Sequence, residues 1–298
     1  MNGYKVLAHL GAIGAIVGVA YAMNSPAAHA DDPLAGSDTA IILGGTGEPT
    51  PSTAFAQAAE DLYLHPLGFD GGATGSTVCD MVGTDPCAAP LQVLTTPELF
   101  QQDPSTLTDA DDVTLAVENE FNANPGAFTA DHPLTIFGYS QSAAAESIAM
   151  TRLAQDGIPS ADLHFVFIGD PSLPGGIGPA TGTGALANVT PDNLYPATIY
   201  SLDTDPVANF QQVVEAKGLD GAMLDIFGPH VEYLGLTPTE IADATTTTNG
   251  DLTLVDISDS DVNNVDAWLT ALLEHGVADS GPLQSVFQSL ELLFFNTY

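Results

Sequence analysis

The sequence predicts an α/β fold in which a mostly parallel central sheet carries helices on both faces. Short apolar runs alternate along the chain with stretches at helical spacing, a pattern typical of parallel strands connected by helices. One of these runs passes through a tight turn of small residues directly into a helix of good helix formers. The chain has 298 residues and a hydrophobic fraction of 45%, which suffices for one large packed domain and excludes global disorder.

The N-terminal half of this pattern contains one strand and two helices. The strand is the apolar run 39–43, which has the composition of a buried strand. Helices are predicted over 54–62 and 107–121, and Asn124-Pro125-Gly126 ends the second one. The intervening segment 64–104 is predicted to be loop-rich and contains both cysteines.

The central part of the chain contains a strand, a turn and a helix in direct succession. They are predicted at 134–137, 138–142 and 143–154. Two further buried strands are predicted at 163–168 and 197–200. This alternation is the main reason to expect a parallel, doubly wound sheet.

Four other stretches have weaker signals. The four threonines at 245–248 precede Asn249-Gly250 and are predicted to be a turn or mobile loop, and 174–184 is a second loose stretch rich in Gly, Pro and Thr. Apolar residues at helical spacing predict an amphipathic core helix over 262–273. The segment 283–295 is more apolar still, so it either covers the core or touches lipid.

Residues 1–30 have the layout of a secretory signal peptide. Lys5 is the only charged side chain there, the apolar run 6–22 follows it, and Ala28-His29-Ala30 is a small-x-small cleavage site. Cleavage leaves residues 31–298 as a single domain that is secreted or held in the cell envelope. The alternative is a retained N-terminal membrane anchor, although the length of the apolar run is near the minimum for a helix that spans a membrane.

The charge balance is strongly acidic. Three basic residues face 38 acidic ones, for a formal net charge of −35. Nucleic acid is therefore excluded as a partner, because phosphate binding needs clustered Lys or Arg, and anionic lipid surfaces would repel the chain. The acidic residues are scattered, which predicts a solvated surface. Transient contact with a lipid surface and the oligomeric state stay open.

The chain has two cysteines, Cys79 and Cys87. In an exported protein they are expected to form a disulfide, which would stabilise the fold by roughly 2–3 kcal/mol in the chain-entropy model. The alternative is a pair of reduced thiols. Two cysteines without paired histidines do not form a zinc site, so no metal is predicted.

The turn at 138–142, Gly-Tyr-Ser-Gln-Ser, contains the candidate nucleophile. A nucleophilic serine must stand clear of the sheet, and a sharp strand-to-helix turn between small residues achieves this in the α/β-hydrolase fold. Gly138 fits the pattern, and Ser142 replaces the usual second glycine with another small residue. We therefore predict Ser140 as the nucleophile. The alternative is an ordinary turn with an N-capping serine.

The base of such a site is expected to follow the serine and the acid in chain order. Of the later histidines, His164 lies at a strand start, and His275 precedes a glycine at a helix end, where histidine commonly caps. His230 follows Phe227-Gly228-Pro229, a loop context that suits a base. We predict His230 as the base.

The orienting carboxylate is expected after a late strand. Asp203 and Asp205 both follow the strand at 197–200, and Asp205 starts a turn just past it. We predict Asp205 as the acid. Asp170 is a third candidate, but it follows the preceding strand. The alternative role of each aspartate is turn formation.

The second donor of an oxyanion hole normally comes from the loop after an early strand. Gly44-Gly45-Thr46-Gly47 is such a loop, and its glycines allow close approach of the backbone to a substrate. A phosphate-binding loop is the alternative, but no Gly-Lys-Ser/Thr follows. We predict Thr46 as one donor and the backbone N–H of Gln141 as the other.

Several segments together resemble the PE-PPE C-terminal domain, a cutinase-like serine hydrolase family known from mycobacterial secreted proteins. The resemblance covers roughly residues 39–233. Its pieces are Ile41 to Gly47 with Pro49 and Pro51, Thr96 to Phe100, Gly138 to Ser142, Gly169 to Pro171 with Pro174 to Ile177, Asp205 to Ala208, and Gly228 to Tyr233. The family usually has a second aspartate four residues after the first, where this chain has Asn209.

The resemblance implies a triad of Ser140, Asp205 and His230 that acts on acyl esters, and export to the cell envelope. The expected activity is that of a secreted esterase or lipase that works without a cofactor. Two alternatives stay open: acyl transfer between envelope glycolipids by the same triad, and a non-catalytic interaction domain of the envelope that keeps the fold.

Overall fold

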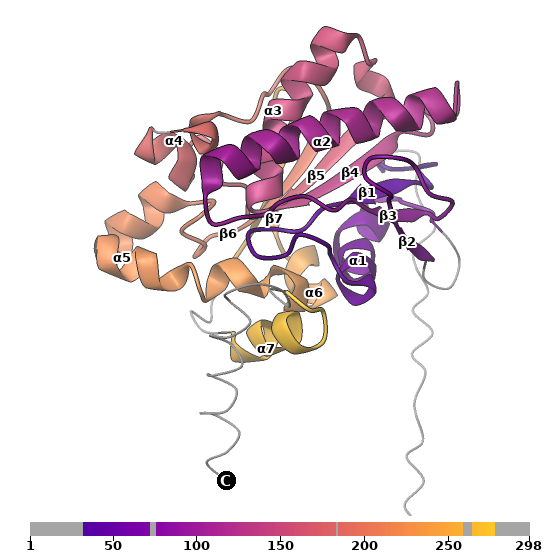
Figure 1. The fold of residues 1–298 in the computed structure, drawn as a ribbon. Helices are drawn as coiled ribbons and strands as arrows, with labels where there is room; N and C mark the ends of the chain where they lie inside the picture. Colours follow the sequence, from indigo (N-terminus) through magenta and orange to yellow (C-terminus); the bar gives the residue numbers. More distant parts are fainter. Residues whose placement is uncertain (1–31, 72–75, 183, 259–263, 278–298) are drawn as a thin grey trace, which may run out of the picture.

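One eight-stranded sheet forms the centre of the computed structural model, which describes residues 32–71, 76–182, 184–258 and 264–277 (Figure 1). Seven strands run parallel, and only the edge strand β7 is antiparallel to its neighbour. From edge to edge the strands are β2 (Val78–Asp80), β3 (Leu91–Val93), β1 (Ala40–Ile42), β4 (Leu134–Tyr139), β5 (Leu163–Ile168), β6 (Ala197–Leu202), β8 (Leu252–Ile257) and β7 (Thr245–Asn249).

Helices cover both faces of the sheet (Figure 1). One face carries α2 (Gln102–Ala123) and α3 (Gln141–Asp156), which pack against each other. The other face carries α1 (Thr53–Ala59), α6 (Pro238–Ala242) and α7 (Val265–Leu273). The predicted α/β fold with a mostly parallel sheet and helices on both faces is confirmed.

Successive side chains of a strand point to opposite faces, and two hydrophobic cores result. Ala40 and Ile42 pack with α1 and α7 in one core, whereas Ile41 packs with α2 and α3 in the other. All three side chains are fully buried. This explains why the strand is a continuous apolar run and not an alternating one.

Three further helical segments gather beyond the carboxyl ends of β5 and β6. They are α4 (Ile177–Thr181), α5 (Phe210–Asp225) and the 3₁₀ segment Pro229–Gly235. Gly218 interrupts α5 with φ 74° and ψ 169°, a conformation that essentially only glycine adopts. The piece after this break leads into the 3₁₀ segment that contains His230.

The predictions for the central elements are confirmed with small shifts of their ends. The strands predicted at 134–137, 163–168 and 197–200 are β4, β5 and β6. The helix predicted over 107–121 is α2, which begins earlier, at Gln102. The helix predicted over 262–273 is α7, and α5 and β8 were not predicted.

The predicted loops contain some regular structure. The segment 64–104 is loop-rich, as predicted, and it also contains the strands β2 and β3, which are only three residues long and lack the length of a recognisable pattern. The prediction of a turn or mobile loop at 245–248 was wrong: these threonines form β7, because β-branched residues favour strands and Gly250-Asp251 turns the chain back onto β8 as a hairpin. The loose stretch 174–184 contains the short helix α4.

The predicted disulfide is confirmed. Cys79 lies in β2 and is bonded to Cys87, in the connection to β3. The bond therefore closes a short loop at one edge of the sheet.

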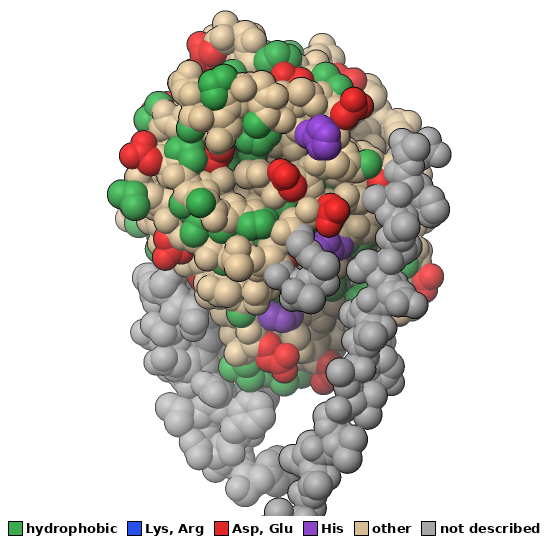
Figure 2. All heavy atoms as spheres, turned by 90° about the vertical axis from the view of Figure 1, so that its right-hand side faces the viewer, with side chains coloured by type: hydrophobic (Ala, Val, Ile, Leu, Met, Phe, Trp, Pro, Cys, Tyr) green, Lys and Arg blue, Asp and Glu red, His purple; other side chains and the backbone are tan. Residues whose placement is uncertain are grey.

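Acidic side chains are dispersed on the one face of the molecule that Figure 2 shows. On the face at the β2 edge they lie singly among neutral and hydrophobic side chains (Figure 2). No helix in the described ranges has both the length and the apolarity needed to cross a membrane. The predicted signal peptide, residues 1–30, and the apolar segment 283–295 lie outside the described residues.

Candidate active site

Ser140 lies at the sharp turn between β4 and α3. Its backbone has φ 58° and ψ −114°, and it is one of two described non-glycine residues with positive φ. A Cβ at Gly138 would collide with the Glu146 carboxyl and approach Ala143 N to 3.0 Å, so glycine allows strand and helix to pass closely here. This is the strained strand-turn-helix geometry of the α/β-hydrolase fold.

Ser142 takes the place of the second glycine and contributes two hydrogen bonds to the turn. Its hydroxyl accepts from Tyr139 N–H at 2.8 Å and donates to the Tyr139 carbonyl at 3.1 Å. The residue is fully buried. Tyr139 is the last residue of β4 and Ser142 lies in the first turn of α3. The two bonds therefore connect the strand to the helix across Ser140.

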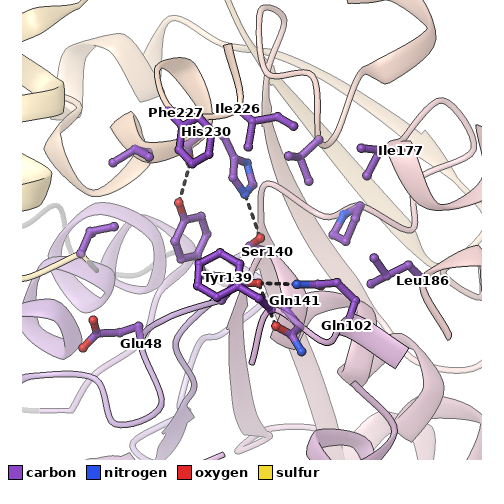
Figure 3. Close-up of a pocket in the computed structure, with 16 residues that line it drawn as sticks. Glu48, Gln102, Tyr139, Ser140, Gln141, Ile177, Leu186, Ile226, Phe227 and His230 are labelled. Carbon is purple, nitrogen blue, oxygen red and sulfur yellow. Dashed lines mark hydrogen bonds between the residues drawn. The ribbon is translucent and has the colours of Figure 1, made fainter. Parts of the chain in front are cut away.

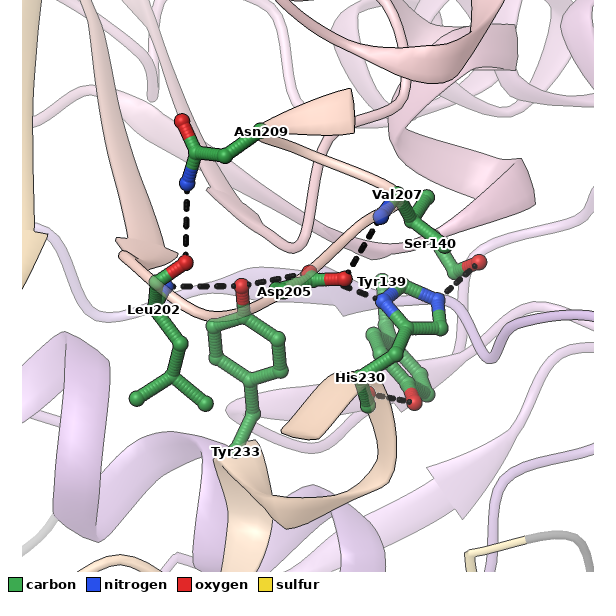
Figure 4. A network of polar contacts seen from close by, with 8 residues as sticks. All are labelled: Tyr139, Ser140, Leu202, Asp205, Val207, Asn209, His230 and Tyr233. Carbon is green, nitrogen blue, oxygen red and sulfur yellow. Dashed lines mark hydrogen bonds and ion pairs between the residues drawn. The ribbon is translucent and has the colours of Figure 1, made fainter. Parts of the chain in front are cut away.

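Ser140, His230 and Asp205 form a hydrogen-bonded chain (Figure 4). His230 Nε2 lies 2.8 Å from Ser140 Oγ, and His230 Nδ1 lies 2.9 Å from Asp205 Oδ2. With Nδ1–H donating to the carboxylate, Nε2 is free to accept the serine hydroxyl proton. Ser140 and His230 are 8% and 7% exposed and Asp205 is fully buried, so solvent reaches the serine and the histidine but not the aspartate.

Both oxygens of Asp205 are occupied. Oδ1 accepts from Val207 N–H at 2.7 Å, and Oδ2 accepts from the Tyr233 hydroxyl at 2.7 Å as well as from His230. Burial, reinforced by the charge of Asp205, raises the pKa of Tyr233, so its hydroxyl stays protonated and donates. The Tyr139 hydroxyl donates to the His230 carbonyl at 2.6 Å and fixes the histidine backbone.

The other aspartate candidates and Asn209 have different partners. Asn209 Nδ2 donates to the Leu202 carbonyl at 2.8 Å and points away from His230 (Figure 4). Asp170 is buried and accepts from Thr190 and Ser172, and burial raises its pKa to about 6.

Two other histidines are not part of the hydrogen-bonded chain formed by Ser140, His230 and Asp205. His164 Nε2 is 3.0 Å from Thr198 Oγ1, and burial lowers the pKa of His164 to about 4, so the ring stays neutral in the sheet. His275 interacts with the Leu234 carbonyl. The structure brings together the three residues that the sequence favoured and separates them from the alternatives.

The glycine-rich loop after β1 lies against the serine. A Cβ at Gly45 would be 3.0 Å from the Tyr139 carbonyl and 3.1 Å from Ser140 Cβ, so this close approach depends on glycine. The backbone N–H groups of Thr46 and Gln141 donate no hydrogen bond to any described residue. Gln141 N–H is also at the start of α3, where free N–H groups and the helix dipole favour a negative charge.

The side chains of these two residues are linked to each other. Thr46 Oγ1 donates to Gln141 Oε1 at 2.8 Å and accepts from Gln102 Nε2 at 3.1 Å. The hydroxyl proton of Thr46 is therefore engaged, so of its two donors the backbone N–H is the one that can face a substrate oxygen. Gln102 was not predicted from the sequence.

Ser140 opens into a cavity of about 320 Å³ (Figure 3). Apolar side chains surround the serine on two sides, and polar groups are few. The lining residues are Thr46, Glu48, Phe100, Gln102, Tyr139, Ser140, Gln141, Pro171, Ile177, Leu186, Val207, Ile226, Phe227, His230, Val231 and Val277. Within the described residues, no group of three or more His, Cys, Asp or Glu side chains is arranged to hold a metal ion.

A sequence model of the PE-PPE domain matches residues 88–251, which is more than half of the chain. The chain belongs to the PE-PPE domain family. The matched segment contains Ser140, Asp205 and His230, whereas the loop with Thr46 precedes it.

Two relatives of this PE-PPE protein come from Mycobacterium tuberculosis. The PPE family protein PPE28 is 30% identical over 245 residues, which cover 78% of this chain and 34% of that protein. The protein named esterase PE16 is 30% identical over 224 residues, which cover 70% of this chain and 39% of that protein. The chain thus spans little more than a third of the length of these relatives.

Solved structures resemble this PE-PPE protein only distantly. A cutinase-like protein from Cryptococcus sp. is 16% identical with a TM-score of 0.37, and the match covers 68% of this chain and 97% of that one. The thioesterase RedJ from Streptomyces coelicolor is 15% identical with a TM-score of 0.35, and the match covers 90% and 94%. These likenesses are too distant to indicate a substrate.

Proposed function

We propose that this PE-PPE protein is a serine ester hydrolase in which Ser140 is the nucleophile, His230 the base and Asp205 the orienting acid. The observation that carries the proposal is the hydrogen-bonded chain of these three side chains, with separations of 2.8 and 2.9 Å. Nucleophile, base and orienter within hydrogen-bond reach of one another are the signature of an activated serine.

The proposed reaction has two halves. Ser140 Oγ attacks the ester carbonyl carbon while its proton moves to His230 Nε2, and the carbonyl oxygen becomes an oxyanion at the N–H groups of Thr46 and Gln141. The intermediate collapses when His230 gives the proton to the departing alcohol. Water, deprotonated by His230, then attacks the acyl-enzyme and releases the carboxylic acid, which restores Ser140.

The cavity supports an acyl ester or lipid as substrate. Ile177 and Leu186 lie on one side of Ser140, and Ile226 and Phe227 lie on another (Figure 3). Apolar walls around a few polar groups suit the hydrocarbon part of an ester, because burying its CH₂ groups is favourable. The relative named esterase PE16 is consistent with this substrate class.

A fluorophosphonate probe and a short-chain p-nitrophenyl ester test the proposal. Ser140→Ala is expected to abolish both covalent labelling and turnover. Ser147→Ala is the matched control, because Ser147 is a buried serine on the same helix that bonds to Thr190 and does not line the cavity. Labelling and turnover that persist in Ser140→Ala would contradict the proposed nucleophile.

We also propose that the protein is exported. The disulfide between Cys79 and Cys87 supports this, because disulfides persist mainly outside the reducing cytosol. Mass spectrometry of the mature protein is expected to find an amino terminus at Asp31, directly after the cleavage site predicted from the sequence. An intact N-terminus on the mature protein would indicate a retained anchor instead.

A further inference from the structure

Glu98 is the second described non-glycine residue with a left-handed backbone. Its φ is 43° and it is only 2% exposed. Such a conformation is unfavourable for a residue other than glycine and persists only where the surrounding structure enforces it. Glu98 belongs to the segment 96–100, which is part of the family resemblance, but the hydrogen bonds of this segment go to residues other than the triad. Its conformation therefore calls for a different explanation.

The backbone of this segment holds the loop that carries Thr46. The Glu98 carbonyl accepts from Gly47 N–H at 2.8 Å, and Thr96 N–H donates to the Pro49 carbonyl at 2.9 Å. The two bonds bracket the loop immediately after Thr46. The position of the Thr46 N–H thus depends on the unusual backbone of Glu98.

A second acidic residue, Asp109 of α2, contacts the other oxyanion residue. Asp109 Oδ2 lies 3.4 Å from Gln141 Nε2, and Gln141 Oε1 accepts from Thr46 Oγ1 at 2.8 Å. One fully buried carboxyl is therefore connected to both predicted oxyanion donors through a single amide side chain. Ser105 links this carboxyl to the Glu98 segment, since its hydroxyl accepts from Leu99 N–H and lies 3.4 Å from Asp109 Oδ2.

No cation neutralises these two carboxyls within the described residues. Arg152 and Lys217 form their ion pairs elsewhere, with Asp111 and Asp225. Every further charged group that acts on the two carboxyls is acidic, namely Asp112 from α2 and Glu146 from α3.

Burial without a cation favours the protonated form of both carboxyls. Burial, reinforced by Asp109 and Glu146, raises the pKa of Glu98 well above its usual range. Burial also raises the pKa of Asp109 to about 7. The protonated carboxyls add no negative charge beside the developing oxyanion, whereas an ionised Asp109 would oppose it.

We propose that Glu98 and Asp109 are a positioning pair for the oxyanion hole, in which Glu98 fixes the loop with Thr46 and Asp109 fixes Gln141. The inference rests on the proposed function, because it assigns supports to the same site. It predicts that kcat falls as the pH rises through the pKa of Asp109.

The first test is the pH profile of ester hydrolysis. Asp109→Ala removes the anchor of Gln141 and is expected to lower kcat ~10-fold with little change in KM, since small displacements of catalytic groups slow the chemical step. Asp109→Asn keeps an acceptor for Gln141 but cannot ionise. Asp109→Asn is expected to restore most of the lost kcat and to abolish the fall of kcat at alkaline pH. Glu98→Gln is expected to shift the pH at which kcat falls.

Glu120→Gln is the matched control. Glu120 is also a buried carboxyl of α2 whose pKa burial raises, but it bonds to Asn124, far along the helix from the oxyanion loop. Glu120→Gln is expected to show the same fall of kcat at alkaline pH as the wild-type protein. An unchanged pH profile in Asp109→Asn, with normal kcat in a folded Asp109→Ala, would overturn the positioning pair and leave the proposed hydrolase intact.

A second measurement does not depend on turnover. In the Ser140→Ala protein, the amide ¹H and ¹⁵N shifts of Thr46, Gly47 and Gln141 are expected to titrate together at the alkaline transition. The titration is expected to vanish with the added change Asp109→Asn and to persist with Glu120→Gln. Amide shifts that do not respond to pH would overturn the proposal, even if the protein proved to have no esterase activity.

Discussion

The two sides of Ser140 are built differently. On the base side, both oxygens of Asp205 and both ring nitrogens of His230 have partners at 2.7 to 2.9 Å. On the oxyanion side, Asp109 meets Gln141 only at 3.4 Å, and one oxygen of Asp109 has no hydrogen-bond partner among the described residues. The base side is therefore a complete and rigid network, whereas the oxyanion side depends on a longer chain of supports.

This contrast implies different sensitivities. Loss of His230 or Asp205 removes a group that transfers or orients the proton, so the loss of activity should be large. A change on the oxyanion side loosens a support, so the loss should be smaller and depend on the protonation of neighbouring carboxyls.

The largest effect is expected on the base side. Asp205→Asn should lower kcat about 10⁴-fold, because an amide does not hold the imidazole in the required tautomer. Adding Asn209→Asp should not rescue activity, since residue 209 points to the Leu202 carbonyl and away from His230. Steady-state kinetics of the single and double variants measure both effects, and rescue by the second change would assign the acid to residue 209.

An intermediate effect is expected on the oxyanion side. Gln141→Ala keeps the backbone N–H but removes the side chain that links Thr46 to Asp109. We expect kcat to fall ~10-fold while KM changes little, because the donor becomes less well placed. Gln92→Ala is the control: Gln92 is also a buried glutamine, but it bonds to Cys87 N–H and does not line the cavity. Equal kcat losses in both variants would contradict the special role of Gln141.

The smallest effect on turnover is expected from Tyr233→Phe. The change leaves Leu202 N–H and one bond of Asp205 without their partner, so the free energy of unfolding should fall by about 1–3 kcal/mol. Turnover should fall only a few-fold, because Val207 and His230 still hold Asp205. Denaturant unfolding and kcat measure the two consequences.

Tyr195→Phe separates stability from turnover. Tyr195 is a fully buried tyrosine in the other core, where its hydroxyl donates to the Ile158 carbonyl. Its variant should lose stability and keep the wild-type kcat. If Tyr233→Phe also keeps the wild-type kcat, Tyr233 stabilises the fold and does not position Asp205.

The serine turn was predictable from the sequence because its signals are local. A strand, a small-residue turn and a helix follow one another within 134–154, so the geometry of Ser140 needs no distant information. His230 and Asp205 could be predicted from chain order because the fold fixes which loops meet the nucleophile. The structure brings these side chains together, and their catalytic roles stay proposals for the experiments above.

The supports of the site could not be predicted in the same way. Tyr233 meets Asp205 across 28 positions of sequence, and Gln141 meets Asp109 across 32. No local pattern marks such contacts, since a buried tyrosine or a mid-helix aspartate has many alternative roles. The strand β7 was missed for another reason, because a run of threonines before Asn249-Gly250 fits a loop as well as an edge strand.

The two edges of the described sheet are protected from pairing with another molecule in different ways. The β7 edge exposes hydroxyl-bearing threonines, which offer little apolar surface for an adjoining strand. The β2 edge is short and covalently closed by the disulfide. Reduction of that bond would free one edge and leave the other unchanged. A reducing cytosol is therefore a poor place to produce this protein, because the fold would lack this cross-link there.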